Sequence, residues 1–169
     1  MNLKEIYLRA LEPEDIEILG KIENNSHYWN YSNQTEPFSR HILKQFINQQ
    51  KQDIFEVRQK RFVISNNENN VLGFIDLFDY EPLHRRAGVG LFIIESFRNL
   101  GLGKQALKLV HILTKKHLNI KTLFANVGKE NTSSNSLFLS LGYRQVGLKK
   151  KWNFYEDAFH DEYLYQKIL

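Results

Sequence analysis

The 169-residue chain contains no cysteine. Disulfide bonds, thiolate nucleophiles and metal sites with cysteine ligands are therefore excluded. Proline is also scarce, at three residues, and no hydrophobic run approaches the roughly 20 residues that a membrane-spanning helix needs. The stretch from Met1 to Leu11 alternates charged and apolar residues and shows no signal-peptide pattern. These absences are compatible with a cytoplasmic protein that has no membrane partner.

The composition is that of a globular protein. With 42% hydrophobic and 25% charged residues, the chain suits a single domain, residues 1–169, with its own core. The net charge of +4 would allow a nucleic-acid partner, but only Lys149 to Lys151 form a basic cluster, and such a run is more often a solvated face. A polyphosphate cofactor explains a mildly basic chain equally well. We therefore expect no nucleic-acid partner.

The first part of the chain predicts a strand and two helices. Leu3 to Arg9 alternates as a half-buried strand, and a helix from Pro13 to about residue 24 follows. Ser39 is the expected N-cap of a second helix, Arg40 to Gln50. The residues expected to face inward on this second helix are Ile42, Leu43, Phe46 and Ile47.

A polar stretch from Asn25 to Phe38 lies between these helices and is predicted to be a loop. It is dense in asparagine and serine, yet it carries the aromatic residues Tyr28, Trp29 and Tyr31, with Glu36 just before a proline. A polar loop with three aromatic residues is either a lid packed onto the body or one wall of a ligand site. Both interpretations remain open from the residues alone.

The rest of the chain alternates strand and helix patterns. The expected strands are Arg61–Ser65, Val71–Phe78, Val89–Ile94, Thr122–Val127, Tyr143–Lys151 and Glu162–Ile168. A helix with Leu102, Ala106, Leu109, Val110 and Leu113 inward follows a glycine turn, and another runs from Asn131 to Leu141. Residues 152–161 are expected to link the last two strands. This order predicts an α/β fold, a mixed sheet flanked by helices.

The glycine turn before the long helix is the first functional signal. Gly101 and Gly103 let the backbone turn tightly, and the free N–H groups at a helix start carry about half a positive charge, which suits phosphate. Loops between strands and helices also need glycine for ordinary steric reasons, which leaves both interpretations open. Neither the dinucleotide-binding pattern G-x-G-x-x-G nor the P-loop pattern is present.

The turn does match [RQ]-x-x-G-x-[GA] after a strand, through Arg98, Gly101 and Gly103. This pattern resembles the coenzyme A pyrophosphate loop of the GNAT N-acetyltransferases. The resemblance continues through Leu8–Asp15, Arg61–Ile64, Gly73–Leu77, His84–Ala87, Asn131 and Leu141–Tyr143, and looks like the bacterial spermidine/spermine N-acetyltransferase branch. It implies the GNAT fold: a mixed, mostly antiparallel seven-stranded sheet with about four helices, splayed between its fourth and fifth strands.

The resemblance also implies an acetyl-CoA-dependent acyltransferase without a metal. Phe92 and Ile93 would line the pantetheine arm, and Asn131 would hydrogen-bond it. For Ile93 alone a core position explains the residue as well, and for Asn131 a helix N-cap does. The pyrophosphate would be held by Arg98, Asn99, Leu100, Gly101, Leu102, Gly103 and Lys104.

The implied acceptor is a primary amine, with Tyr28 and Trp29 in the wall of its site. Because a lysine-like amine titrates near 10.4, freeing its lone pair at pH 7 costs roughly 4 to 5 kcal/mol and needs a proton acceptor. We assign that role, through water, to Asp76, and the holding of a distal amine to Glu36 or Asp79. A carboxylate that binds the cation also raises the pKa of the amine. An exposed acid at a strand end is an equally good explanation of Asp79.

The leaving group reveals a departure from the family. The family commonly has a tyrosine four residues before the last glycine, where it protonates the departing thiolate, and this chain has Phe138 there. General acid help is typically worth about 10²–10⁴-fold. Ser134 lies one helical turn earlier on the same face, and we predict that it, or a water that it holds, assists instead.

Three interpretations compete. The first is an N-acetyltransferase for a polyamine such as spermidine or spermine, acting by direct attack in a ternary complex. The second is a GNAT enzyme for another amine: a protein N-terminus, an aminoglycoside or an amino acid. The third, suggested by Phe138, is a catalytically weak acyl-CoA-binding module. A homo-oligomer is compatible with the resemblance, but a polyamine-sensing site is not inferable, since Thr35 replaces one of its two usual acids.

Overall fold

The computed structural model describes residues 5–32 and 34–169. Seven strands form one sheet in the order β1-β2-β3-β4-β5-β7-β6, in which only β4 and β5 pair in parallel. The strands are β1 Ile6–Ala10, β2 Lys60–Asn66, β3 Val71–Glu81, β4 Arg86–Ile93, β5 Thr122–Gly128, β6 Arg144–Tyr155 and β7 Ala158–Ile168. The predicted mixed sheet is confirmed; residues 3 and 4 of the first predicted strand lie outside the described residues.

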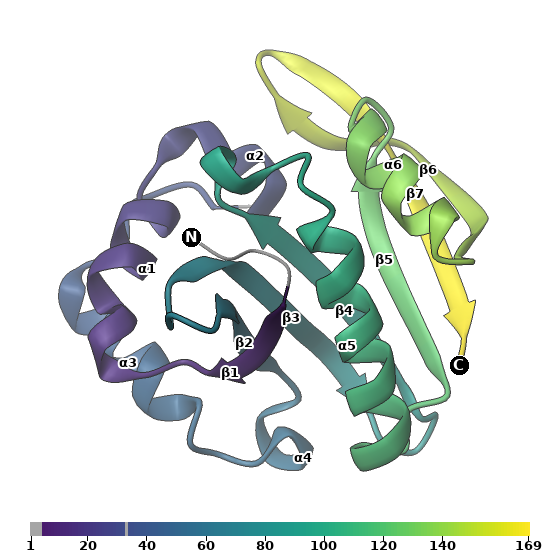
Figure 1. Cartoon of the computed structure of the whole chain (residues 1–169). Helices are drawn as coiled ribbons and strands as arrows, with labels where there is room; N and C mark the ends of the chain where they lie inside the picture. Colours follow the sequence, from purple (N-terminus) through teal and green to yellow (C-terminus); the bar gives the residue numbers. More distant parts are fainter. Residues whose placement is uncertain (1–4, 33) are drawn as a thin grey trace.

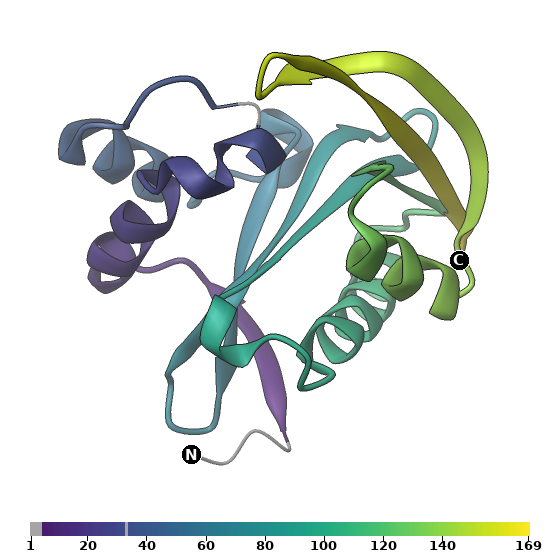
Figure 2. The ribbon, with the colours of Figure 1, turned by 90° about the horizontal axis from the view of Figure 1, so that it is seen from above.

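Helices cover both faces of this sheet (Figure 1). Seen from above, α5 and α6 lie on one face, and α1, α2 and α3 lie on the other (Figure 2). The helices are α1 Ile16–Glu23, α2 Trp29–Ser32, α3 Arg40–Gln49, α4 Ile54–Val57, α5 Leu102–His117 and α6 Thr132–Ser140. Four of them are longer than a single turn, as predicted. Within the described part of the chain, no helix is long and apolar enough to cross a membrane.

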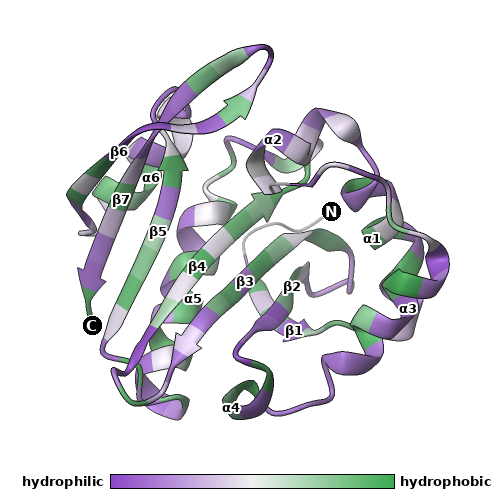
Figure 3. Ribbon diagram, turned by 180° about the vertical axis from the view of Figure 1, so that it is seen from behind, coloured by the Kyte–Doolittle hydropathy of each residue, from purple (hydrophilic) through white to green (hydrophobic). Residues whose placement is uncertain are grey.

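Two hydrophobic clusters attach the helices to the sheet. The larger lies between the sheet and α5 and includes Leu107 and Ile75, both fully buried. The smaller lies under α1 and α3 and includes Leu19, Leu43 and Phe74. Because β3 and β4 are covered on both faces, they are hydrophobic along most of their length, as Figure 3 shows. The clusters hold the central strands in place between two helical layers.

The buried faces of the helices differ in detail from the predicted ones. On α3, Leu43 and Ile47 are buried, but Ile42 is 45% exposed, because successive helical residues point about 100° apart. The prediction that Ile42 faces inward is therefore wrong. On α5, Leu107 and Thr114 are fully buried, whereas the structure leaves the predicted Leu109 and Leu113 only half-buried.

Three segments contain more regular structure than the sequence predicts. The stretch expected to be a loop holds a 3₁₀ turn, Ser26–Tyr28, and then α2. A single helical turn, α4, precedes β2 and was not predicted; Asp53 caps it. The expected link at 152–161 is mostly strand, because Glu156 and Asp157 adopt φ values of 50° and 56° and form a two-residue hairpin turn.

Strands β4 and β5 part after a short parallel ladder. The paired residues are Arg86 with Thr122, Ala87 with Leu123 and Gly88 with Phe124. Strand β4 nevertheless continues to Ile93 and β5 to Gly128, so the facing edge of β4 beyond Gly88 has no β5 partner. The two strands diverge in Figure 1, and the predicted splay is confirmed. We call the point of parting the fork.

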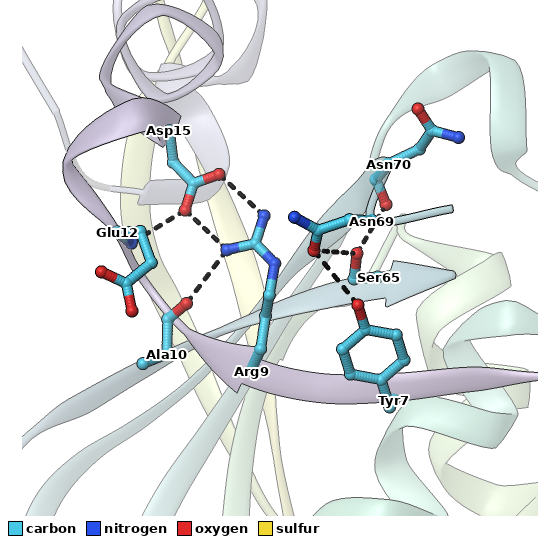
Figure 4. Close-up of polar contacts among 8 residues, drawn as sticks. All are labelled: Tyr7, Arg9, Ala10, Glu12, Asp15, Ser65, Asn69 and Asn70. Carbon is cyan, nitrogen blue, oxygen red and sulfur yellow. Dashed lines mark hydrogen bonds and ion pairs between the residues drawn. The ribbon is translucent and has the colours of Figure 1, made fainter. Parts of the chain in front are cut away.

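A paired arginine and aspartate anchor β1 to the start of the first helix (Figure 4). Arg9 donates Nη1 and Nη2 hydrogen bonds of 2.7 and 2.8 Å to the two carboxylate oxygens of Asp15. The backbone N–H of Glu12 adds a third bond to Asp15, at 2.9 Å. Burial alone raises the pKa of Asp15, but the bonds from Arg9 and Glu12 and the charge of Arg9 outweigh it and lower the pKa below 3.8.

We expect Asp15→Asn to lower the free energy of unfolding by about 2–3 kcal/mol at pH 7, since the nearly buried Arg9 loses its charged partner. The melting temperature should fall by roughly 5–10 °C. A depressed folded-state pKa contributes stability above pH 3.8 and loses it as the pH falls further. Calorimetry at several pH values, with exposed Asp157→Asn as control, tests this. An unchanged melting temperature at pH 7 would contradict it.

Candidate active site

The glycine turn places three backbone amides at the open start of α5. Gly101 is the N-cap, with φ of 76°, a left-handed conformation that favours glycine. The first helical hydrogen bond runs from the Gln105 N–H to the Gly101 carbonyl, at 3.2 Å. The N–H groups of residues 102–104 therefore precede the helical ladder and point out of the helix end. This geometry can bind a phosphate group, as the sequence predicts.

Gly103 has a different role from Gly101. A Cβ at Gly103 would lie 3.0 Å from Cδ2 of Leu91 on β4 and 3.2 Å from Cδ2 of Leu137 on α6. At Gly101, by contrast, nothing lies within 4 Å of a Cβ. Gly103 therefore lets the start of α5 pack closely against β4 and α6, and this close packing positions the free amides beside the fork.

Aromatic side chains lie beside the glycine turn. Arg98 donates an Nε hydrogen bond of 3.0 Å to the Ile93 carbonyl, which ties the turn back to the end of β4. Its guanidinium lies 5.6 Å from the ring centre of Tyr28 and 5.7 Å from that of Phe92. The two rings pack edge to face at 4.9 Å. Tyr28, predicted for the amine site, thus lies against the coenzyme-side turn, and the Tyr28 hydroxyl also approaches Glu95, at 3.5 Å.

Two strand glycines shape the fork, and the sequence analysis did not single them out. A Cβ on Gly88 would lie 2.3 Å from Cε2 of Phe78, whose ring crosses β4 and meets Phe124 of β5 edge to face at 5.6 Å. Gly90 pairs with Asp76, and a Cβ on Gly90 would lie 3.7 Å from Cε1 of Phe78 and 4.0 Å from Cβ of Asp76, so a larger side chain would fill the space next to Asp76. Alternating glycines in a strand indicate close approach of another group, and this signal was available in the sequence.

Asp76 lies on β3 at the level where β4 loses its β5 partner. Its carboxylate accepts bonds of 2.7 Å from Nε and 2.8 Å from Nη2 of Arg61. Arg61 also donates from Nη1 to the carboxylate of Glu23 at the end of α1. Arg61 and Glu23 therefore belong to the candidate site beside Asp76, and the sequence analysis missed them, because partners 38 positions apart in the chain leave no local pattern.

Within the described part of the chain, no hydrogen bond joins Asp76 to the other predicted acceptor residues, which are Trp29, Glu36 and Asp79. Trp29 donates its indole N–H to the backbone carbonyl of Glu23 at 2.8 Å and so ties α2 to α1. Glu36 is exposed, and its carbonyl accepts a bond from Gln34. Asp79 is exposed in a bulge of β3, with φ of 47°. No described residue forms a hydrogen bond or an ion pair with the carboxylates of Glu36 or Asp79.

A family model described as "Acetyltransferase (GNAT) domain" matches residues 5–144. The chain belongs to the GNAT acetyltransferases. It is therefore an acyltransferase, and acetyl-CoA is the acyl donor of this family, which confirms the predicted family, fold and enzyme class. Among the described residues, no three histidine, aspartate or glutamate side chains gather as they would around a metal ion.

Individual relatives are similar over most of their length. A spermidine N(1)-acetyltransferase of Escherichia coli is 26% identical over 142 residues, 84% of this chain and 74% of that protein. An uncharacterized prophage-derived N-acetyltransferase of Bacillus subtilis, YokL, is 26% identical over 91% of this chain and 84% of its own. A Vibrio cholerae spermidine N-acetyltransferase, solved with CoA and spermine, superposes with a TM-score of 0.88 at 21% identity, covering 96% and 95% of the two chains.

In this GNAT chain, Asn131 caps α6. Its Oδ1 accepts a hydrogen bond of 3.1 Å from the Ser134 N–H, so the N-cap interpretation is correct. No described residue accepts a hydrogen bond from Asn131 Nδ2, which leaves this donor for the predicted contact with the pantetheine arm. Ser134 is half-buried on the first turn of α6, and no described group hydrogen-bonds its hydroxyl.

Phe138 lies in the core at the other end of α6. It is 4% exposed and packs edge to face with Tyr143 at 4.9 Å and stacked with Tyr165 at 6.1 Å. Burial raises the pKa of both phenols, with a further contribution at Tyr165 from the charge of Tyr163. The Tyr143 hydroxyl pairs with His111 Nε2, and Tyr165 donates to Asn135, both at 3.0 Å. Both phenols are fully buried and their hydroxyl groups are already hydrogen-bonded, so neither replaces the tyrosine that the family commonly has at position 138.

Proposed function

We propose that this GNAT enzyme transfers the acetyl group of acetyl-CoA to a primary amine, with a polyamine such as spermidine or spermine as acceptor. One observation carries the proposal: Asp76 on β3 pairs with Gly90, which belongs to the stretch of β4 beyond the fork whose other edge has no β5 partner. A thioester held along that free edge would lie beside an acid that can accept a proton. The spermidine-acetylating relatives add support for the polyamine class.

Both substrates would be bound together before the reaction. The amide groups of Leu102, Gly103 and Lys104 bind the pyrophosphate, and the free edge of β4, with Phe92 and Ile93, holds the pantetheine arm. The uncharged amine nitrogen attacks the thioester carbonyl carbon, so that a C–N bond forms and the C–S bond breaks. The proton of the amine passes through water to Asp76, and the sulfur leaves as a thiolate.

The acceptor class is tested by an assay of thiol release from acetyl-CoA with polyamines, peptides with free N-termini, aminoglycosides and amino acids. We expect spermidine and spermine to give the largest kcat/KM. If thiol is released only with another class of amine, the protein is still an acetyltransferase, but its acceptor is not a polyamine. Acetyl-CoA binding without release for any amine would favour the third interpretation, a binding module, for which Phe138 is the specific observation.

We predict that Ser134→Ala lowers turnover about 10-fold and that Phe138→Tyr raises it by a similar factor, since general acid help is worth about 10²–10⁴-fold when fully established. Both residues lie on α6, one turn apart. The measurement is kcat at saturating acetyl-CoA and spermidine, with the exposed Ser140→Ala of the same helix as control. An unchanged Ser134→Ala together with no gain in Phe138→Tyr would remove this role.

We further propose that the protein works in the cytoplasm, where acetyl-CoA is available, and that it forms a homo-oligomer. The β6–β7 hairpin exposes three large aromatic side chains, each more than 60% accessible: Trp152, Phe154 and Phe159. Exposed aromatic groups gathered on one element are typical of a protein contact. Sedimentation of the purified protein tests this, and a monomer at every concentration would contradict it.

A further inference from the structure

Arg61 connects two carboxylates, those of Asp76 and Glu23, on the side of the candidate site that is proposed to bind the amine. We call this the acceptor side. Arg61 on β2 binds Asp76 on β3 through two parallel hydrogen bonds and Glu23 on α1 through a third. The three side chains are largely shielded, with exposed fractions of 18%, 30% and 16% for Arg61, Asp76 and Glu23. An arginine that donates two parallel hydrogen bonds to both oxygens of a carboxylate fixes the plane of that carboxylate. Asp76 is therefore held in one orientation beside Gly90.

The guanidinium is itself held firmly. Its central carbon lies 5.2 Å from the ring centre of Phe46 on α3 and 5.4 Å from that of Phe74 on β3. The Arg61 backbone N–H donates to the buried amide oxygen of Gln50 at 2.9 Å. Aromatic faces attract a guanidinium and restrict its movement. Arg61 thus ties α1, α3 and β3 together at the acceptor side.

The charges of the three groups leave one net negative charge. Burial alone lowers the pKa of Arg61, but the charges of Asp76 and Glu23 and their hydrogen bonds outweigh it, so the arginine remains protonated. The two carboxylates and the guanidinium sum to −1. Asp76 keeps lone pairs that Arg61 does not use, since a carboxylate accepts about four bonds. A cavity of about 220 Å³, lined by Arg61, Asp76, Phe46 and Phe78 among others, opens beside the group. Lys60 lines the same cavity, but its ammonium group donates to the backbone carbonyl of Gln50 and not to either carboxylate.

A single net charge matters for a reaction that needs a neutral amine. Two uncompensated carboxylates would hold an ammonium group tightly and would raise its pKa, which opposes the loss of its proton. One net charge attracts the cation but leaves the nitrogen easier to deprotonate. Asp76 and Glu23 side by side without Arg61 would therefore improve binding and slow the chemistry.

We propose that Arg61 is a positioning and charge-setting residue for acetyl transfer: it orients Asp76 and limits the net charge of its group with Asp76 and Glu23 to −1. This inference rests on the proposed function, because it assumes that an amine is the acceptor. It assigns a role to Arg61 and Glu23 that is distinct from coenzyme binding, which takes place at the glycine turn.

The test compares pH profiles of kcat, with spermidine as the probe, for Arg61→Gln and the double variant Arg61→Gln/Glu23→Gln. The single variant has a net charge of −2 at this site, and the double variant returns it to −1. We expect Arg61→Gln to lower KM for spermidine about 3-fold, to lower kcat at pH 7 at least 10-fold, and to move the rising limb of the profile up by about one pH unit. The double variant should return the limb to within about 0.3 unit of the original, with only part of kcat restored.

Two controls separate this role from a structural one. Arg9 donates two hydrogen bonds to Asp15 in the same way, but outside the candidate site. Arg9→Gln should therefore lower the melting temperature without moving the pH profile of kcat. Arg61→Lys keeps the positive charge but loses the two parallel hydrogen bonds that the guanidinium donates to Asp76. We therefore expect kcat to fall while the pH profile of kcat stays in place. This variant also tests the proposal if Arg61→Gln does not fold.

The inference is overturned if Arg61→Gln remains active with an unshifted profile, if the double variant shows no return of the shift, or if Arg61→Lys behaves like the wild type in kcat. Acetyl-CoA affinity, measured by calorimetry, should stay within about 2-fold of the wild type in all variants, and a parallel loss would indicate a structural role only. If the wild type acetylates no amine at all, the proposed function itself fails, and the inference fails with it.

Discussion

Gly103→Val should lower the affinity for acetyl-CoA about 100-fold, which corresponds to about 2.7 kcal/mol. A Cβ at this position would lie only 3.0 Å from Cδ2 of Leu91 and 3.2 Å from Cδ2 of Leu137. A branched side chain adds two methyl groups that those leucines cannot both avoid, because they belong to β4 and α6. The start of α5 must shift, and the free amides then no longer meet the pyrophosphate together.

Calorimetric titration with acetyl-CoA measures this effect, and Gly103→Ala should give an intermediate loss of about 10-fold. The matched control is Gly147→Val in β6, where a Cβ makes only ordinary contacts, the nearest at 3.5 Å to Leu164. Valine also suits a strand. If Gly103→Val is folded, by its melting temperature, and binds acetyl-CoA as well as the wild type, the coenzyme assignment of this turn is wrong.

The second large effect is expected from Asp76→Asn, which should reduce kcat for spermidine by about 10²–10³-fold with acetyl-CoA affinity unchanged. The amide cannot take the amine proton, and its NH₂ group faces an Arg61 nitrogen that had been a donor to the carboxylate. Loss of the base and loss of the ordered carboxylate therefore act together. Coenzyme binding should persist, because the glycine turn lies on a different element.

Asp79→Asn is the matched control for this prediction, since Asp79 lies three residues further along β3 and was predicted, as the alternative to Glu36, to hold the distal amine and not to take the proton. Its carboxylate is exposed in the bulge, and we expect less than a 3-fold change in kcat. Steady-state thiol release and calorimetry on the same preparations give both quantities. A small effect of Asp76→Asn, or an equal loss in Asp79→Asn, would remove the role of Asp76 as proton acceptor.

The sequence by itself determined the elements whose signals are local. The strand, glycine turn and helix around Gly101 follow from hydrophobic periodicity and from a backbone angle that glycine adopts freely. The N-caps Ser39 and Asn131 each accept a hydrogen bond from the backbone amide three residues further on, so they too could be predicted from neighbouring residues. The coenzyme half of the candidate site could be predicted from the sequence for the same reason.

Only the tertiary structure decided the acceptor half. Arg61 meets Asp76 through the register of two strands and meets Glu23 because α1 packs over the sheet, and neither contact has a sequence signature. Tyr28 likewise lies against Phe92 rather than beside Asp76, since the two short helical turns after α1 set its position. Contacts between distant segments depend on packing and register, which periodicity and caps do not specify.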